Sequence, residues 1–246
     1  MEHATQAVEA RIERDHWWFR GRRRLVRALI RALETPPSAQ VLDVGCGTGA
    51  NLRLLAEIGF RDVMGMDCSQ EAIEWCAQKG LPDVARGDLR DLPFPEAHFD
   101  LVLATDVLEH IEEEATAISE LHRVLRPGGT LLVTVPAFES LWGLQDEVSH
   151  HVRRYRRDEI VAKLRAGGFR VTRSFYFNFL LFAPIWMARQ LMRWLGVKLA
   201  SENEVNTRWL NALLSAIFAC DVWIAPRLRP AFGVSIFVVA RRRDAV

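Results

Sequence analysis

The sequence has few cysteines and no excess of charge of either sign. Its 246 residues include four cysteines and seven histidines, and these do not show the spacing of zinc ligands. Because the ligand spacing is absent, we expect no metal site. Four cysteines in a chain of this size do not suggest a disulfide framework, and we therefore expect a reducing compartment. The formal net charge of +1 gives no global attraction to nucleic acid, so we expect no nucleic-acid partner.

The beginning of the chain lacks a hydrophobic run. Residues 1–14 are polar and carry several acids, unlike the apolar core of a signal peptide. We therefore expect a cytoplasmic protein. Half of the residues are hydrophobic and 26% are charged, which is an ordinary composition for a globular domain. The length is sufficient for one large domain with an insertion.

Short hydrophobic runs alternate with helical patterns along the middle of the chain. We expect strands at 41–44, 63–66, 84–86, 99–104, 130–135, 169–175 and 234–240, and helices at 51–58, 70–79, 111–125 and 158–166. Strands that alternate with helices over short connections predict a parallel sheet with right-handed crossovers. The fold class is therefore α/β, a doubly wound sheet of seven strands.

Two further helical regions flank this pattern. Residues 5–34 carry apolar side chains at helical spacing, and we interpret 1–35 as a leading helix that precedes an α/β domain at 36–246. About sixty residues separate the last two expected strands, which is far longer than a usual connection. Apolar segments at 178–195 and 209–224 occupy this gap. They predict a helical insertion at about 177–232.

A glycine-rich turn follows the first expected strand, in the segment Val41-Leu42-Asp43-Val44-Gly45-Cys46-Gly47-Thr48-Gly49. Glycines at the junction of a strand and a helix let the backbone approach a ligand closely. Asp67 ends the second strand, where a carboxylate can accept hydrogen bonds from ribose hydroxyls. Both features also occur in nicotinamide-binding sites, so a nicotinamide-dependent oxidoreductase is an alternative at this point.

Three downstream segments carry a more specific signal: GDLRDLPFPEAHFDLV from residue 87, DVLEHI from residue 106 and LHRVLRPGGTLLVTVP from residue 121. Together with VLDVGCGTG they resemble the class I S-adenosylmethionine-dependent methyltransferases, in the branch that includes ubiquinone-biosynthesis and related small-molecule enzymes. The resemblance covers residues 40–136 closely and continues loosely to residue 169. It implies a Rossmann-like sheet that is mostly parallel with an antiparallel last strand, and S-adenosylmethionine as the cofactor.

The same resemblance implies roles around the cofactor. Asp43 would help to position the amino group of the methionine moiety, Asp67 would hold the ribose and Asp88 would contact the adenine amino group. The other residues implied at the cofactor are Gly45, Gly47, Gly49, Cys68, Leu89 and Asp106. Asp43 as a turn residue and Asp106 as a helix cap are the structural alternatives to these roles.

Other residues are candidates for the acceptor side. A base is needed only where the acceptor is a poorly ionised hydroxyl or a protonated amine. Related enzymes often carry a histidine followed by Arg-Tyr after the fifth strand, so His151 is the first candidate and His150 the second. The leading helix resembles a lid, and the expected acceptor contacts are Trp17, Trp18, Arg154 and Tyr155. Packing alone is the alternative for each of them.

The acceptor itself is indicated only by the insertion. Residues 178–224 combine apolar helices with tryptophans that resemble interfacial anchors. We expect a small-molecule or lipid-like acceptor, methylated at oxygen, and we hypothesise that this region binds a lipid-linked form of it and contacts the inner face of the membrane. A cap over a soluble small molecule, or a dimer interface, is the alternative. The remaining alternatives are a nucleic-acid methyltransferase, which the arginine clusters at 22–24 and 153–157 permit, and a binding module without activity.

Overall fold

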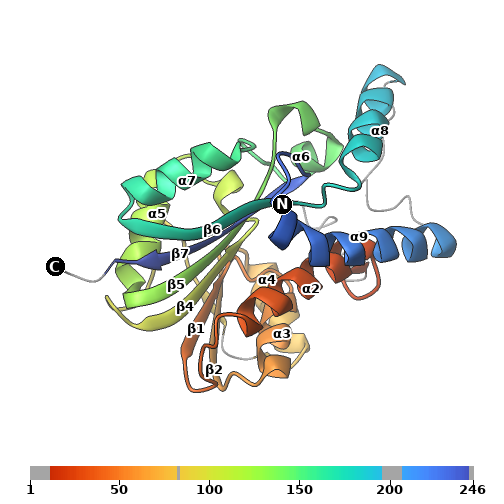
Figure 1. Cartoon of the computed structure of the whole chain (residues 1–246). Helices are drawn as coiled ribbons and strands as arrows, with labels where there is room; N and C mark the ends of the chain where they lie inside the picture. Colours follow the sequence, from red (N-terminus) through yellow and green to blue (C-terminus); the bar gives the residue numbers. More distant parts are fainter. Residues whose placement is uncertain (1–11, 82–83, 196–206, 244–246) are drawn as a thin grey trace.

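The computed structural model describes residues 12–81, 84–195 and 207–243. The strands are β1 (Gln40–Val44), β2 (Asp62–Asp67), β3 (Val84–Arg86), β4 (Phe99–Thr105), β5 (Leu125–Pro136), β6 (Phe169–Phe177) and β7 (Ser235–Arg242). They form one sheet in the order β3-β2-β1-β4-β5-β7-β6 (Figure 1). β7 pairs antiparallel with β5 and β6, whereas the other neighbours are parallel. The predicted seven-stranded, mostly parallel sheet with an antiparallel last strand is confirmed.

The helices agree with the sequence pattern except at residues 13–16, where a turn interrupts the expected first helix before α2, around residues 108–148, and at residues 178–181. They are α2 (Trp17–Arg31), α3 (Ala50–Ile58), α4 (Gln70–Gln78), α5 (Glu114–Val124), α6 (Leu144–Val148), α7 (Arg157–Ala166), α8 (Phe182–Leu195) and α9 (Arg208–Leu228), with 3-10 turns η1 (Leu108–His110) and η2 (Glu139–Leu141). The expected helix at 111–125 begins only at Glu114, after η1 has turned the chain. Helix α6 was not predicted, because five residues are too few to show a helical period. The part of the expected first helix at 5–11 lies outside the described residues.

The core lies on both faces of the sheet. Along β4, Leu101 and Leu103 pack with side chains of α2, α3 and α9, whereas Val102 and Ala104 pack with α5 and α7. Successive strand residues point to opposite faces, so burial on both faces explains why the strand is hydrophobic at consecutive positions. This is the doubly wound arrangement, in which ligands bind at the carboxyl ends of the strands.

The leading helix and the insertion pack directly against one another. At Gly21, an added Cβ would lie 2.1 Å from the Phe218 ring, so only glycine permits α2 and α9 to cross this closely. The backbone N–H of Trp17 donates to Asn211 Oδ1 at 2.7 Å, and Asn211 Nδ2 donates to the Asp15 carbonyl at 2.8 Å. The two segments, which lie at opposite ends of the chain, therefore form one structural unit (Figure 1).

A buried carboxylate fixes the point where the insertion begins. Asp221 of α9 is fully buried and accepts hydrogen bonds from the backbone N–H groups of Asn178, Phe179 and Leu180 at 2.6–3.0 Å. These bonds hold the chain in a turn after β6, with Asn178 at a φ of +55°. The apolar segment expected at 178–195 is consequently helical only from Phe182 onward.

Candidate functional site

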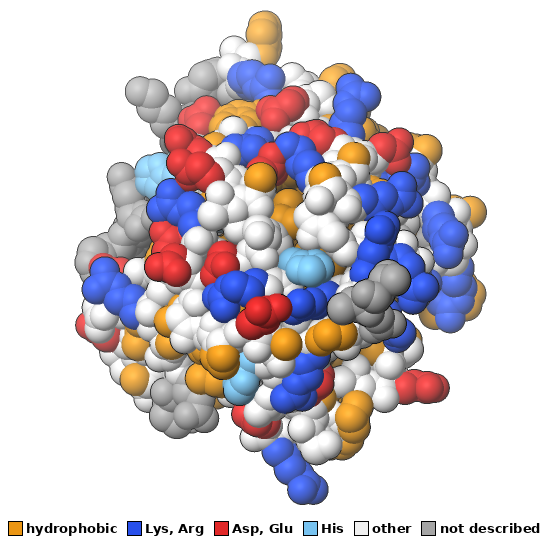
Figure 2. Space-filling model, turned by 90° about the vertical axis from the view of Figure 1, so that its left-hand side faces the viewer, with side chains coloured by type: hydrophobic (Ala, Val, Ile, Leu, Met, Phe, Trp, Pro, Cys, Tyr) orange, Lys and Arg blue, Asp and Glu red, His pale blue; other side chains and the backbone are white. Residues whose placement is uncertain are grey.

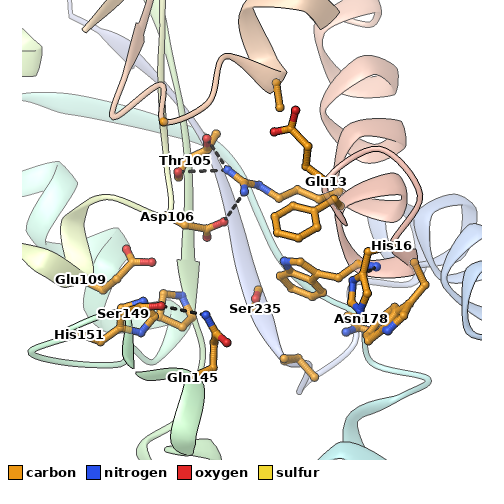
Figure 3. Close-up of a pocket in the computed structure, with 18 of the residues that line it drawn as sticks. Glu13, His16, Thr105, Asp106, Glu109, Gln145, Ser149, His151, Asn178 and Ser235 are labelled. Atoms are coloured by element: carbon orange, nitrogen blue, oxygen red, sulfur yellow. Dashed lines mark hydrogen bonds and ion pairs between the residues drawn. The ribbon is translucent and has the colours of Figure 1, made fainter. Parts of the chain in front are cut away.

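A cavity of about 490 Å³ lies at the carboxyl ends of β1 and β4 (Figure 3). The chain adds β2 and β3 on one side of β1 and then crosses to add β4 and β5 on the other side, so the strand order reverses between β1 and β4. Open α/β sheets form their ligand crevices at such a point. The glycine-rich turn, the start of α2, the segment after β4 and the insertion supply its walls. The residues that line it include Glu13, Trp17, Trp18, Arg22, Gly45, Gly47, Asp106, Glu109, His110, His151, Arg154, Asn178, Arg189 and Leu214.

The glycine-rich turn has a conformation that side chains would prevent. Gly45 and Gly47 have φ angles of +66° and +52°, and a Cβ at Gly45 would lie 2.2 Å from Val107 Cγ2. Asp67 Oδ2 accepts a hydrogen bond from the Gly47 N–H at 2.8 Å, and Asp67 Oδ1 accepts one from Ser69 at 2.9 Å. The turn is therefore held by the acid at the end of β2, and its backbone forms part of the cavity wall.

Asp43 lies behind this turn and is fully buried. Its Oδ1 accepts a hydrogen bond from Asn51 Nδ2 at 3.1 Å, whereas Oδ2 has no hydrogen-bond partner among the described residues. Burial raises the pKa of this carboxyl to about 7, and the bond from Asn51 opposes that shift. Asp43 is thus near the balance between its two protonation states at neutral pH.

The end of β4 is joined to the leading helix by Arg22. Its guanidinium donates to the Thr105 carbonyl at 3.1 Å and to Thr105 Oγ1 at 2.6 Å, and it lies 3.1 Å from Asp106 Oδ2. Thr134 donates to the other oxygen of Asp106 at 2.9 Å. Asp106 therefore lines the cavity as the ion-pair partner of an arginine from α2 (Figure 3).

A second contact holds the leading segment over the glycine-rich turn. The side chain of Glu13 is buried, accepts a hydrogen bond from Thr48, and lies 2.5 Å from Arg53 and 2.9 Å from Lys79. Burial opposes ionisation, but the bonds from Thr48, Lys79 and Arg53 lower the pKa of Glu13 overall. This segment therefore covers one end of the cavity.

On the opposite wall, His151 belongs to a buried hydrogen-bond network. Its Nδ1 lies 2.8 Å from Asp146 Oδ1, and the same carboxylate accepts bonds from Arg154 Nε at 2.8 Å and Nη2 at 3.0 Å. Burial opposes ionisation of Asp146, yet the bonds from His151 and Arg154 lower its pKa to about 2. A carboxylate on Nδ1 fixes the imidazole orientation and leaves Nε2 available for chemistry.

The insertion supplies the remaining wall. Ile185, Ala188 and Met192 of α8 and Leu214 of α9 give this part an apolar surface. Asn178 lies at its margin, fully buried, with both side-chain polar atoms lacking a hydrogen-bond partner among the described residues. The cavity thus combines an apolar wall with an unsatisfied amide, which is typical of a site that orients a mainly hydrophobic ligand.

Some of the residues predicted from the sequence line this cavity and others do not. Gly45, Gly47, Asp106, Trp17, Trp18, His151 and Arg154 line it. Asp88 lies elsewhere and binds Arg90, with two oxygen–nitrogen distances of 2.6 and 3.0 Å, while Leu89 is buried in the core. Gly49 caps α3, Cys68 is exposed and His150 is exposed. Tyr155 is buried, and its hydroxyl donates to Glu114 at 2.9 Å.

The polar residues of the site that were not predicted include Glu13, Arg22, Asp146 and Asn178. Glu109 also lines the cavity, and its position within the DVLEHI segment was a sequence signal that could have identified it as a site residue. The other four belong to segments whose position against the strand ends depends on the tertiary fold. Sequence spacing alone does not bring them together.

Several arginines of the two clusters that permitted a nucleic-acid partner make internal contacts. Besides Arg22 and Arg154, Arg23 donates to the Arg14 carbonyl at 2.8 Å and Arg153 lies 2.8 Å from Glu114. On the side of the molecule that carries α5 and α7, acidic and basic side chains both occur across the surface (Figure 2). These observations do not favour a nucleic-acid substrate.

Comparisons with known proteins agree with the architecture of the site. A family model described as a methyltransferase domain matches residues 42–133. The chain is 39% identical over 103 residues to 2-methyl-6-phytyl-1,4-hydroquinone methyltransferase from Synechocystis, which is 40% of this chain and 32% of that protein. It is 32% identical over 149 residues to malonyl-[acyl-carrier protein] O-methyltransferase from Enterobacter lignolyticus, with 58% and 59% of the two chains covered. The match thus spans less than two thirds of these relatives' own length.

A solved structure extends the similarity to the whole fold. The crystal structure of a SAM-dependent methyltransferase from Thermotoga maritima aligns with a TM-score of 0.60 and 18% identity, covering 99% of this chain and all of the other. The three segments downstream of the glycine-rich turn argue against the oxidoreductase alternative, because a nicotinamide-dependent enzyme is not expected to carry them. The chain therefore belongs to the class I S-adenosylmethionine-dependent methyltransferases, whose methyl donor is S-adenosylmethionine.

Proposed function

We propose that this chain transfers a methyl group from S-adenosylmethionine to an oxygen of a hydrophobic, lipid-like acceptor. The observation that carries the proposal is the two-sided cavity, which has a cofactor-type glycine turn on one wall and apolar side chains of the insertion on another. Two similar proteins are named for acting on a phytyl hydroquinone and on an acyl-carrier substrate. Both names are consistent with a partly hydrophobic acceptor.

The residues present fit the cofactor. A Cβ at Gly47 would meet no atom within 4 Å, so the backbone there faces open space. Asp67 keeps acceptor capacity for ribose hydroxyls beyond its two backbone bonds. Asp43, with one unpaired oxygen, would attract the methionine amino group. Asp88, Leu89, Gly49 and Cys68 remain proposed contacts on the adenine side. When bound, the cofactor supplies an electrophilic methyl carbon.

His151 is the residue that we propose to activate the acceptor. Its Nδ1 is engaged by Asp146, so Nε2 is the nitrogen that can take a proton from a hydroxyl in the cavity. Asp146 favours the protonated imidazole that results. Asn178 can donate to and accept from the same acceptor head group. Trp17 and Trp18 would contact the apolar part, whereas His150 and Tyr155 have no contact with the cavity that supports their predicted roles.

We further propose that the insertion contacts the inner face of the cytoplasmic membrane. The tryptophans of α8 and α9 are unusually exposed: Trp194 is 82%, Trp209 69% and Trp223 65% accessible. By length and composition α9 is also able to cross a membrane. We favour surface contact, because Phe218 and Asp221 bind one face of α9 to the protein. The opposite face then exposes Trp209 and Trp223, and tryptophan is a residue typical of the membrane interface.

Methyl transfer can be tested with isotopically labelled S-adenosylmethionine. The purified chain is incubated with a lipid extract or with an aqueous metabolite extract, and products are followed by mass spectrometry. Label is expected in the lipid fraction and not in the aqueous one. Asp67→Ala should abolish labelling, whereas the matched variant Asp62→Ala, at the exposed start of β2, should retain it. Label confined to the aqueous fraction would contradict the lipid-like acceptor.

Membrane contact can be tested by sedimentation with anionic liposomes. The double variant Trp209→Ser, Trp223→Ser should lose most binding, because these side chains would no longer insert at the interface. Trp75→Ser on α4 removes a tryptophan from a different helix and serves as the matched control. Equal binding of all three proteins, or no binding of the intact chain, would argue against this part of the proposal.

A further inference from the structure

Three potential metal ligands meet at the wall of the cavity opposite α2. Glu109 and His110 belong to η1, and His151 follows α6. One ligand atom from each lies within 4.8 Å of the others. We propose that Glu109, His110 and His151 bind a divalent transition-metal ion beside the acceptor pocket. Spacing along the sequence predicts no such site, because the fold brings residues about forty positions apart into contact.

Glu109 is the strongest reason for a cation at this point. Its side chain is fully buried, and neither carboxylate oxygen has a hydrogen-bond partner among the described residues. A buried carboxyl without a partner is costly in either protonation state. A bound cation would remove this cost by keeping the carboxylate ionised and coordinated.

The neighbouring charges leave Glu109 available for such an ion. Asp106 is 3.1 Å from Arg22, and Asp146 is 2.8 Å from Arg154. Both of these acids are therefore already neutralised by a cation from the protein. Among the described residues at this wall, Glu109 is the carboxylate that lacks a comparable ion pair.

Both histidines are prepared to act as ligands. His110 lines the cavity beside His151, and an imidazole nitrogen is a common ligand of transition-metal ions. Asp146 engages Nδ1 of His151 and so directs Nε2 toward the cluster. A carboxylate behind a histidine is the usual outer-sphere support of a metal ligand. The two imidazole rings lie 4.7 Å apart at an interplanar angle of 79°.

The ligand types indicate the class of ion. Two imidazole nitrogens and one carboxylate oxygen suit Zn²⁺, Mn²⁺, Fe²⁺ or Co²⁺ better than Mg²⁺ or Ca²⁺, which prefer oxygen ligands. Bonds of about 2.1 Å would bring any two ligand atoms to within about 4.2 Å, so small side-chain rotations complete the set. All three residues line the cavity, and the open coordination positions therefore face the acceptor.

The site would change how the acceptor is activated. With an ion bound, His151 Nε2 is a ligand, and an acceptor hydroxyl that coordinates the ion loses its proton to water more readily. This consequence rests on the proposed function, whereas the binding of the ion does not. The ion would also favour acceptors with an oxygen, or a pair of oxygens, near the methylated position.

Metal binding can be measured without cofactor or acceptor. Full-length, tag-free protein is stripped with a chelator and titrated separately with Zn²⁺, Mn²⁺, Co²⁺ and Mg²⁺ by calorimetry, and the Co²⁺ complex is recorded by visible absorption. We expect one transition-metal ion per chain and much weaker Mg²⁺ binding. Glu109→Gln and His151→Asn should each weaken binding by on the order of tenfold or more. The matched controls Glu147→Gln and His150→Asn, which change exposed neighbours of the same types, should bind as the unchanged protein does.

Binding of S-adenosylhomocysteine to every variant confirms that each is folded and separates this proposal from the previous one. If the intact chain binds no transition metal, or if cluster and control variants bind equally, the metal site is wrong even where the cofactor binds. Preference for Mg²⁺ would also overturn it. If metal binds but no labelled product forms, the metal site stands and the proposed function fails. Loss of methyl transfer on chelation, restored by Zn²⁺ or Mn²⁺, would support the acceptor role.

Discussion

Replacing Gly47 by alanine tests whether the glycine-rich turn is a wall of the cofactor site. Gly47 has a φ of +52°, and an added Cβ would meet no protein atom within 4 Å. The cost to folding is therefore only that of the left-handed conformation, about 1–2 kcal/mol for a residue with a side chain. In a domain of this size each kcal/mol lowers the unfolding temperature by about 2–4 °C. The variant should fold and unfold roughly 2–8 °C below the unchanged protein.

Cofactor affinity should fall by much more than this strain suggests. The methyl group would occupy space at the cavity wall, and we expect S-adenosylhomocysteine to bind at least about tenfold more weakly, or about 1.4 kcal/mol. Gly80→Ala is the matched control, because Gly80 has a φ of +71°, its Cβ also meets nothing within 4 Å, and it does not line the cavity. Calorimetric titration of both variants measures the difference.

The comparison is decisive because the two variants carry the same backbone strain. A weaker affinity in both would mean that strain spreads through the domain and that the turn has no special role. An unchanged affinity in Gly47→Ala alongside a lower unfolding temperature would refute the reasoning directly. In that case the cofactor does not lie against this turn.

Three further outcomes concern stability, each measured by denaturant or thermal unfolding. Gly21→Val places a side chain against the Phe218 ring, where a Cβ has only 2.1 Å, and should destabilise the protein by about 1–3 kcal/mol. Asp43 has a folded pKa of about 7, above its unfolded value of 3.8, so stability falls as pH rises from about 4 to 7; Asp43→Asn should remove this slope. Asp146→Asn leaves the buried Arg154 without its carboxylate and should cost about 3–5 kcal/mol at pH 7. Because the folded pKa of Asp146 is about 2, the difference should shrink as pH falls below 4.

The sheet was predictable because its signals are local. β1 and β4 are mainly apolar, each with one aspartate inside the strand, and they are followed by Gly45 and Asp106; burial on both faces favours such apolar segments. The antiparallel last strand was implied by the family resemblance and not by any pattern within β7. The boundaries that differ from prediction, at Glu114 and Phe182, are set by 3-10 turns or by tertiary hydrogen bonds, which leave no periodic trace in the sequence.

The polar site was predictable only in part, for a related reason. The glycine turn and Asp67 occupy a conserved geometric relation to a strand end, so the spacing of the chain locates them. The contact of His151 with Asp146 depends on a five-residue helix, and the contact of Arg22 with Asp106 spans 84 positions along the chain. Glu109 is buried without a partner, which is a property of three-dimensional surroundings and not of residue order.

The packing of α2 against α9 connects the two halves of the proposed site. α2 carries Arg22 to the strand ends, and its Trp18 stacks on Phe177 and makes a tilted ring contact with Phe218, so one helix contacts both the cofactor wall and the insertion. Since Gly21 leaves no space between α2 and Phe218, α2 cannot move away from the glycine turn without carrying α9 or breaking this packing. Any motion that opens the cofactor end therefore also displaces the apolar wall at the acceptor end. Binding at one end should accordingly order the other, because both ends depend on the same helix contact.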